Sequence, residues 1–464
     1  MRNLYSIRTG LLAVALFIGV PTLPAQTAST NEIEALREQI RLLDEKLRVL
    51  ERKQELKDEA AAAGTKTQPK LTATDGRIEI ASGDGANSLR LRGLVQADSR
   101  WYLQGADNTH DSFILRRARL IFEGRFNRNF TYQLVPEFGG GSPALLDANV
   151  TIPVTAGSRI KAGKFKVPVG LEQLQSDSSA FFAERSVATA LTPNRDVGVQ
   201  WEGTVLEDRL DYAFGVFNGQ PDGGSSNNGA DFNDGKTVAA RLFAHPFAGN
   251  KESSWQGLGL GLGASAGRYV TASGRTSGYR TDGQQSFFAY RGSTVADGDG
   301  FVYSPQAYYY AGPFGFLAEY VVSTIDLTNG TSPVRTIRNT GWNLSLGWVL
   351  TGESASFRGV TPRTRFDPAA GTWGAIELVA RVSGLDVDDA VFTGGPASLA
   401  DPATGATRVI SGGLGLNWYL SPAVRTSIDI FRSDFALHPG ATPVAGTLLS
   451  EEETVLITRL QVAF

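Results

Sequence analysis

The sequence ends with the segment Thr454-Val455-Leu456-Ile457-Thr458-Arg459-Leu460-Gln461-Val462-Ala463-Phe464. Every second residue from Leu456 to Phe464 is apolar or threonine, and the residues between them include Arg459 and Gln461. Because the side chains of a β-strand point alternately to two faces, the segment is predicted to be a strand with one apolar and one mixed face. Such an apolar edge is rare in a soluble protein. A barrel in a bacterial outer membrane would close on it, with the apolar face in lipid and the terminal ring at the membrane interface.

The composition of the 464-residue chain agrees with strands that cross a membrane. Hydrophobic residues make up 42% of the chain, glycine occurs 53 times and the mean hydropathy is -0.13. Alternating strands average to such values, whereas no apolar run beyond the amino terminus is long enough for a membrane-spanning helix. The lack of cysteine removes disulfides, thiolate metal sites and cysteine nucleophiles. The net charge of -3 gives no global basic field for nucleic acid.

Residues 1–25 have the pattern of a secretory signal peptide. Arg2 and Arg8 supply the positive region, residues 11–20 the apolar core, and Ala25 a small residue at the expected cleavage point. The alternative is a membrane anchor, but the apolar core is too short to span a bilayer.

Residues 26–70 are predicted to form a coiled-coil helix and a linker. Apolar residues recur at alternating steps of three and four, which places them in one narrow seam of a helix: Ile33, Leu36, Ile40, Leu43, Leu47 and Leu50. Charged residues fill the positions between them, which favours self-association over a lone amphipathic helix packed on its own domain. From Ala60 to Lys70 we expect a flexible linker, so that residues 71–464 form the membrane domain.

From about residue 88 onward the chain alternates like a series of strands. In residues 88–102, one set of positions includes Leu89 and Trp101 and would meet lipid, while the other includes Arg90 and Asp98 and would meet water. We count about sixteen strands, an even number that is large enough for an aqueous lumen. An all-β, transmembrane antiparallel barrel therefore fits better than a soluble array of β-sandwiches.

Short turns and long loops alternate between these strands, as is usual in membrane barrels. The long loops are expected near residues 167–195, 219–235, 270–300, 325–338, 386–407 and 435–453. The connection at residues 351–372 is also long, although it falls on the side of the short turns.

Basic residues crowd onto the lumen face of the first, second and fifth strands and onto the root of the following loop. These candidate anion-binding residues are Arg90, Arg92, Arg117, Arg119, Arg159, Lys161, Lys164 and Lys166. Arginine presents fixed donors that suit phosphate-like oxyanions, and clustered cations on one wall favour anions. The alternative is that these cations pair with lumen acids, including Asp98, Glu123 and Asp147, and only stiffen the wall.

The loop at residues 167–194 is predicted to fold inward and narrow the pore. Alternation is lost at Gly163, which permits a bulge before the loop, and a loop of this length between barrel strands can enter the lumen. The alternative is an external loop without contact to solutes. Between residues 171 and 194 the loop has one base, Arg185, against the acids Glu172, Asp177 and Glu184.

Catalysis finds little support in the sequence. The three histidines, His110, His245 and His438, have no metal-ligand spacing, and no serine has the context of a nucleophile elbow. We therefore expect no catalytic residue, no metal and no cofactor. A barrel enzyme and a structural or adhesive barrel with partner-binding loops remain as alternatives to a channel.

Several stretches together resemble the phosphate-selective porins O and P. The clearest is the arginine-rich second strand, Leu115-Arg116-Arg117-Ala118-Arg119-Leu120-Ile121-Phe122-Glu123-Gly124. The others are residues 163–168, 181–186, 374–381, 415–419 and 459–461, and the resemblance covers about residues 75–464.

The resemblance implies an outer-membrane homotrimer of sixteen-stranded barrels in which small anions, including phosphate or polyphosphate, diffuse passively. It implies an inward-folded third loop and an arginine ladder, with Arg117 and Arg119 as ladder members and Lys164 and Lys166 at the approach to the constriction. Outer-membrane lipid is the other expected partner, and nucleic acid is not. The acidic third loop leaves a general, non-selective porin as the alternative function.

Overall fold

The computed structural model describes residues 30–74, 77–106, 109–226, 233–250, 252–271, 276, 278–330, 332–441 and 450–464. The predicted signal peptide at residues 1–25 lies outside these ranges. The chain divides into two compact units, the first ending at Thr67 and the second beginning at Gln68.

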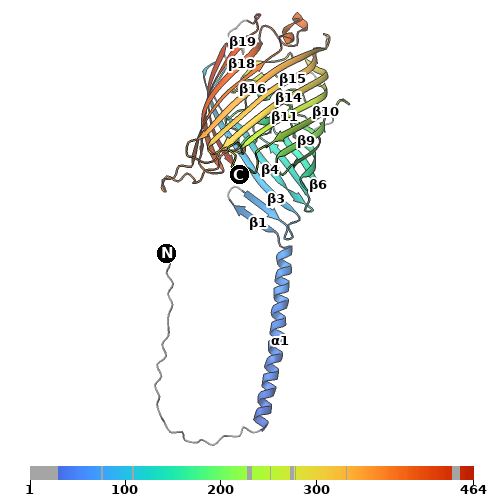
Figure 1. The fold of residues 1–464 in the computed structure, drawn as a ribbon, viewed down its shortest axis with the longest axis vertical. Coiled ribbons are helices and arrows are strands. Elements are labelled where there is room, and N and C mark those ends of the chain that lie inside the picture. Colours follow the sequence, from blue (N-terminus) through green and yellow to red (C-terminus); the bar gives the residue numbers. More distant parts are fainter. Residues whose placement is uncertain are drawn as a thin grey trace. The chain divides into compact units, whose positions relative to one another are not determined.

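The first unit contains the helix α1 (Thr30–Thr67; Figure 1). Its seam residues, from Ile33 to Leu50, are between 45% and 65% exposed, so the single chain leaves this apolar stripe uncovered. The linker predicted from Ala60 to Lys70 is wrong, because α1 continues to Thr67 and a strand begins at Lys70. Alanine favours the helix, and Pro69 lacks the amide that would continue it. None of the described helices is both long and apolar enough to cross a membrane.

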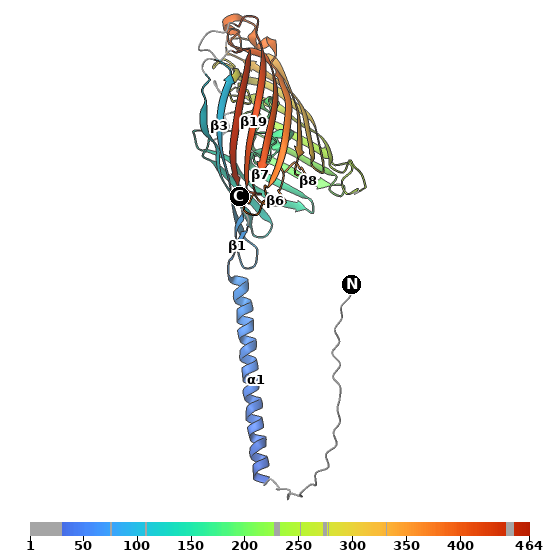
Figure 2. The ribbon, with the colours of Figure 1, turned by 90° about the vertical axis from the view of Figure 1, so that its left-hand side faces the viewer.

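The second unit is a closed antiparallel barrel, in agreement with the predicted fold class. Its sixteen strands within the described residues are β3 (Ser88–Gln104), β4 (Ser112–Phe126), β5 (Phe130–Glu137), β6 (Ala144–Thr155), β7 (Ser158–Lys166), β8 (Arg195–Val205), β9 (Leu210–Phe217), β10 (Thr237–Ala244), β11 (Leu258–Val270), β14 (Val295–Ala311), β15 (Phe314–Thr328), β16 (Arg335–Val349), β17 (Ala375–Asp386), β18 (Ala406–Tyr419), β19 (Val424–Leu437) and β20 (Glu452–Ala463). Each barrel strand pairs antiparallel with the next barrel strand in the chain, and β20 pairs with β3 to close the sheet. Figure 2 shows this closing side, with β3 and β19 in view.

A short hairpin of β1 (Lys70–Thr74) and β2 (Arg77–Ala81) precedes the barrel. The strand β2 pairs with the start of β3, so that Glu79 lies opposite Arg90. The hairpin therefore lengthens the barrel wall at the side that carries the first lumen cations.

The alternation predicted from the sequence is found as alternating burial. On β3, Val95 and Trp101 are exposed, whereas Gln96 and Asp98 are buried. The final strand behaves in the same way at Leu460, which is exposed, and at Arg459, which is buried. Apolar side chains therefore face lipid and polar side chains face the interior, as the membrane requires.

The carboxyl-terminal residue completes the closure of the barrel. The amide of Gly93 donates to the carbonyl oxygen of Phe464 at 2.7 Å, and the amide of Phe464 donates to that of Gly93 at 3.0 Å. The ring of Phe464 covers Gly93 so closely that a Cβ at this glycine would lie 2.4 Å from it. Any larger residue at position 93 would displace the terminal ring.

The connection between β7 and β8, residues 167–194, folds into the lumen and is named the third loop. This confirms the predicted inward fold. The backbone amides of Leu171 and Glu172 donate to the carboxylate of Glu319 on β15 at 2.8 and 3.0 Å. On β11, Gly263 gives the loop room, since a Cβ there would lie 2.2 Å from a loop carbonyl oxygen. The third loop contains the short helices α2 (Leu171–Leu174) and η1 (Val187–Leu191).

Two further loops complete an apolar core inside the barrel. One carries the hairpin of β12 (Tyr279–Arg280) and β13 (Ser286–Phe288), and the other carries η2 (Asp389–Phe392) and η3 (Gly395–Ala397). Phe288, Phe392 and Leu399 from these loops join Val187 and Leu191 of the third loop in one buried cluster. The lumen beside β15–β18 is therefore filled by protein.

The long loop predicted near residues 325–338 is wrong. β15 extends to Thr328 and β16 begins at Arg335, so only residues 329–334 connect them. Ile325, Leu327 and Ile337 face inward and belong to the same apolar cluster as the inserted loops. Apolar side chains on the inner face obscured the strand pattern there, because that pattern assumes a watery lumen.

Candidate solute pathway along the basic wall

Two adjoining cavities follow the wall of β3–β9. We name them the vestibule, of about 600 Å³, and the central cavity, of about 540 Å³. Both are lined by Arg159, Lys161 and Glu202, so the two spaces meet along β7 and β8. All eight predicted cations stand on this wall: Arg90 and Arg92 on β3, Arg117 and Arg119 on β4, and Arg159, Lys161, Lys164 and Lys166 on β7.

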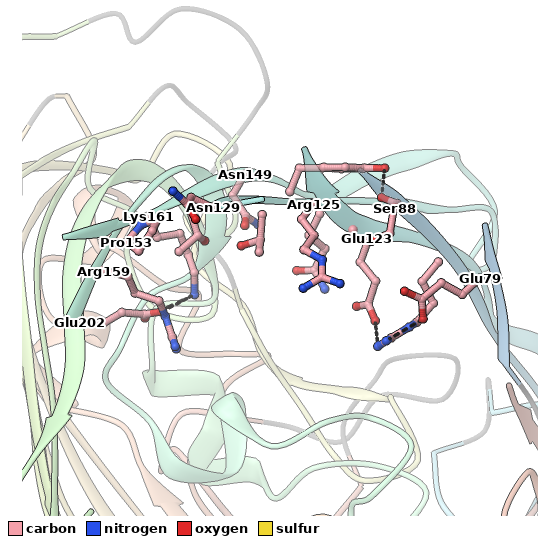
Figure 3. Close-up of a pocket in the computed structure, with 16 residues that line it drawn as sticks. Glu79, Ser88, Glu123, Arg125, Asn129, Asn149, Pro153, Arg159, Lys161 and Glu202 are labelled. Carbon is pink, nitrogen blue, oxygen red and sulfur yellow. Dashed lines mark hydrogen bonds and ion pairs between the residues drawn. The ribbon is translucent and has the colours of Figure 1, made fainter. Parts of the chain in front are cut away.

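The vestibule, which lies near the short turns, has a cluster of ion pairs on each side (Figure 3). On one side, Arg90 lies 3.1 Å from Glu79 and 3.3 Å from Glu123, measured between side-chain nitrogen and oxygen. On the other side, Glu202 lies 2.7 Å from the Nε of Arg159 and 3.1 Å from the Nζ of Lys161. These pairs correspond to the alternative in which lumen cations stiffen the wall.

Two arginines near the vestibule keep more of their charge available. Figure 3 shows Arg125 between the two ion-paired clusters, and its side chain makes no hydrogen bond or ion pair within the part of the chain that the structure describes. Arg92 has a side chain that is 45% exposed, and its contact with Glu123 is long, at 3.6 Å. Arg92 was a predicted site residue, whereas Arg125 was not.

The central cavity has more basic than acidic side chains. Its seven basic residues are Arg92, Arg119, Arg159, Lys161, Lys166, Arg195 and Arg241. Its four acidic residues are Asp147, Asp177, Glu202 and Asp211. The surplus of fixed positive charge lies beside the third loop, since Leu174, Ser176 and Asp177 of that loop also line the cavity.

The two predicted ladder arginines of β4 are held by the third loop. Arg117 lies 3.2 Å from Asp177 and donates to Gln96 at 2.7 Å. Arg119 pairs with the same Asp177 and lies 2.5 Å from Glu137. Arg117 is buried and does not line the central cavity, whereas Arg119 does.

The two predicted lysines of β7 bind backbone carbonyl groups. The Nζ of Lys164 donates to the carbonyl oxygen of Ser226 at 2.8 Å, in the connection between β9 and β10. The Nζ of Lys166 donates to that of Gln175 at 2.9 Å, in the third loop. Lys166 also lines the central cavity, whereas Lys164 does not.

The role of the acidic residues of the third loop was missed by sequence reasoning. Glu184 lies 2.6 Å from Arg116, 2.8 Å from Arg100 and 3.4 Å from Arg459, which come from three different strands. Burial opposes ionisation of Glu184, but the attraction of Arg116 and other arginines outweighs it and holds the pKa of this carboxyl well below its usual range. The one signal in the sequence was the excess of acids over bases in this loop.

A further arginine comes from the long connection at residues 350–374. This segment supports the third loop from the side of the short turns, since Ser179 donates to the carbonyl oxygen of Arg358 at 2.8 Å. Its Arg365 lines a cavity of about 470 Å³ together with Arg92 and Arg119. The unusual length of this connection was evident from the sequence, but its contact with the third loop was not.

One histidine contacts an acidic residue that lines the central cavity. The Nε2 of His245 is 3.1 Å from Asp211, and its ring packs on Phe243 with 5.2 Å between ring centroids. Among the residues that the structure describes, no group of three or more histidine, aspartate or glutamate side chains could hold a metal ion.

A closed sixteen-stranded barrel with a lipid-facing outer surface and a charged lumen is an outer-membrane porin. The family model described as phosphate-selective porin O and P matches residues 89–464, and the chain belongs to this family. It is 27% identical to Porin O of Pseudomonas aeruginosa over 409 residues, which cover 79% of this chain and 88% of that protein.

Solved structures share the fold at low identity. Outer-membrane expressed OmpT of Vibrio cholerae matches with a TM-score of 0.50 and 11% identity, over 85% of this chain and 100% of that one. The trimer form of the in-vitro folded protein matches with a TM-score of 0.50 and 11% identity, over 82% of this chain and 100% of that one. Because the chain belongs to the porin family, the protein is a channel of the bacterial outer membrane.

Proposed function

We propose that the protein lets small anions, phosphate-like oxyanions among them, diffuse passively along the basic wall, and that it catalyses no reaction. The observation that carries this proposal is the surplus of basic side chains in the central cavity. Fixed positive charge in a narrow lumen lowers the energy of an anion and raises that of a cation. Guanidinium groups supply most of the surplus, and their fixed donors suit oxyanions.

The predicted site residues divide into two roles under this proposal. Five line the central cavity and would contact permeating anions: Arg92, Arg119, Arg159, Lys161 and Lys166. Arg90 lines the vestibule, while Arg117 and Lys164 hold the inserted connections in place. Phosphate is the preferred solute that the family description suggests, and polyphosphate stays a prediction. The many ion pairs favour weak selectivity as the second candidate.

We also propose that the protein is a homotrimer. The uncovered seam of α1 supports self-association, since an apolar stripe of this kind is stable only against another helix. The trimer form of the Vibrio cholerae protein shows that a barrel of this fold can assemble in threes.

Ion selectivity in planar bilayers tests the proposal. Purified protein is reconstituted under a salt gradient, and the reversal potential is measured with and without added phosphate. A reversal potential on the anion side supports the proposal, and block of the current by phosphate identifies an oxyanion site. A cation-side potential contradicts it, and a value near zero would show that lumen acids neutralise the basic wall.

A further inference from the structure

One carboxylate of the third loop lies where the basic wall is densest. The Oδ1 of Asp177 is 3.2 Å from Nη2 of Arg117 and 2.6 Å from Nη1 of Arg185, and its Oδ2 pairs with Nη1 of Arg119. The side chain lines the central cavity but is only 5% exposed, because the three guanidinium groups surround it. Lys166, whose Nζ donates to the carbonyl oxygen of Gln175 in the third loop, lies beside this cluster.

This set of donors is one that a phosphate-like oxyanion would need. Three guanidinium groups direct N–H donors at two oxygens that carry one negative charge, and a phosphate offers at least that charge with more acceptors. Two of the donors, Arg117 and Arg119, are placed by the rigid strand β4, and Glu137 orients Arg119 from the neighbouring strand at 2.5 Å. The donors therefore remain positioned when the occupant changes.

Asp177 is fixed in this position and stays charged. The side chain of Gln96 donates to its backbone carbonyl oxygen at 3.2 Å. Burial opposes ionisation, but the attraction of Arg117, Arg185 and Arg119 outweighs it and holds the pKa of Asp177 well below its usual range. A permanently charged occupant neutralises the donors before any solute arrives.

We propose that Asp177 is a built-in counter-ion that occupies an oxyanion-binding site on the pore wall, and that it thereby sets how weakly the channel holds phosphate-like solutes. This proposal rests on the proposed anion pathway. It makes Asp177 a specificity-determining residue: the carboxylate competes with the solute for Arg117, Arg119 and Arg185. Anions then pass the central cavity without being held at these groups.

The test replaces the carboxylate by its neutral isostere. Asp177→Asn removes the charge and keeps the shape, and we expect inorganic phosphate to block chloride current at a concentration about tenfold lower than in the native channel. Glu184→Gln is the matched control, because it also neutralises a third-loop acid bound to three arginines but lines neither the vestibule nor the central cavity. It is expected to leave phosphate block unchanged.

A second variant keeps the test decisive if the first disturbs the loop. The double substitution Asp177→Asn with Arg185→Gln preserves the net charge of the loop and still frees Arg117 and Arg119, so it should also gain phosphate block. Unchanged or weaker block in both variants overturns the role of Asp177, and so does equal gain in Glu184→Gln. The reversal potential of the native channel tests the anion pathway separately, since it does not depend on either substitution.

Discussion

Two arginines near the vestibule differ from their neighbours in how much charge they leave for solutes. Arg92 is half-exposed with one long contact, and Arg125 has no ion pair among the described residues. We expect Arg92→Gln with Arg125→Gln to lower the anion-to-cation permeability ratio by about twofold to threefold, because unscreened lumen charge sets that ratio. Reversal potentials at low ionic strength measure it.

The control for this prediction is Arg128→Gln. Arg128 lies in the turn after β4, is exposed and has only a 4.0 Å contact with Asp84, so its loss should leave the ratio unchanged. An equal change in both variants would mean that the pathway does not follow the vestibule wall.

Arg459 differs from Arg92 and Arg125, because its charge is neutralised by buried carboxylates of the protein. It is fully buried and pairs with Asp98 at 2.6 Å and with Glu184 at 3.4 Å. We expect Arg459→Met to lower the free energy of unfolding by about 3–5 kcal/mol, since Asp98 loses its shortest ion pair and Glu184 loses one of three. Urea unfolding of the barrel in lipid vesicles measures this loss.

A surface ion pair provides the comparison. Arg408 and Asp386 pair on exposed parts of β18 and β17. Arg408→Met should therefore change the free energy of unfolding by less than about 1 kcal/mol. Similar losses in the two variants would show that the buried network around Glu184 does not hold the third loop.

At the scale of elements, strands were easier to predict from the sequence than inserted loops. The period of two in β3 and β20 follows from lipid on one side and water on the other, so local sequence carries it. The inner face of β15 departs from this rule, since Ile325 and Leu327 pack on inserted loops. Sequence reasoning could not place those loops, because their partners are distant in the sequence and follow no repeating pattern.

The candidate site shows the same division. The positions of Arg117 and Arg119 on a lumen face could be predicted from alternation alone. Their pairing with Asp177 could not, because it depends on where residue 177 lies within a loop that has no repeating pattern. An excess of basic residues in the sequence therefore identifies the basic wall of the lumen. It does not show which of these charges remain available to solutes.

The inserted hairpin of β12 and β13 is held by a buried carboxyl group that responds to pH. The hydroxyl of Tyr279 donates to Asp222 at 2.9 Å, and the side chain of Asn339 donates to the same hydroxyl at 2.7 Å. Burial raises the pKa of Asp222 from 3.8 to about 6. The folded protein thus binds this proton more tightly than the unfolded chain. The contribution of this proton to the free energy of unfolding is on the order of 3 kcal/mol. It is fully present below pH 3.8 and is lost as the pH rises to about 6.

We therefore expect the hairpin to fluctuate more at pH 7.5 than at pH 5. Current noise of single channels should rise over this interval, and Asp222→Asn, which mimics the protonated carboxyl, should be quiet at both values. The reverse dependence, or the same rise in Asp222→Asn, would show that another group controls the hairpin.

For the whole molecule, the filled side of the lumen determines where solutes pass. Inserted loops occupy the space beside β15–β18, while the vestibule and the central cavity lie along β3–β9. The strands that carry the basic side chains are those that line these cavities. A chain with a net charge of -3 can therefore still have a positively charged solute pathway. Total charge of a porin is therefore a poor guide to its selectivity, and the charge beside the open path is the relevant quantity.

Assembly of the whole molecule is expected to depend on the seam of α1. Leu43 lies in the seam and Leu42 lies beside it, and both are exposed in the single chain. In a coiled-coil trimer Leu43 would be buried, so Leu43→Asp should cost about 2–5 kcal/mol per chain and lower the temperature at which trimers dissociate. Leu42→Asp should leave that temperature nearly unchanged. Single-channel conductance should be the same in both variants, because the solute pathway belongs to the barrel. Equal dissociation temperatures in the two variants would mean that the barrel walls alone hold the trimer together, and that the helix serves another contact.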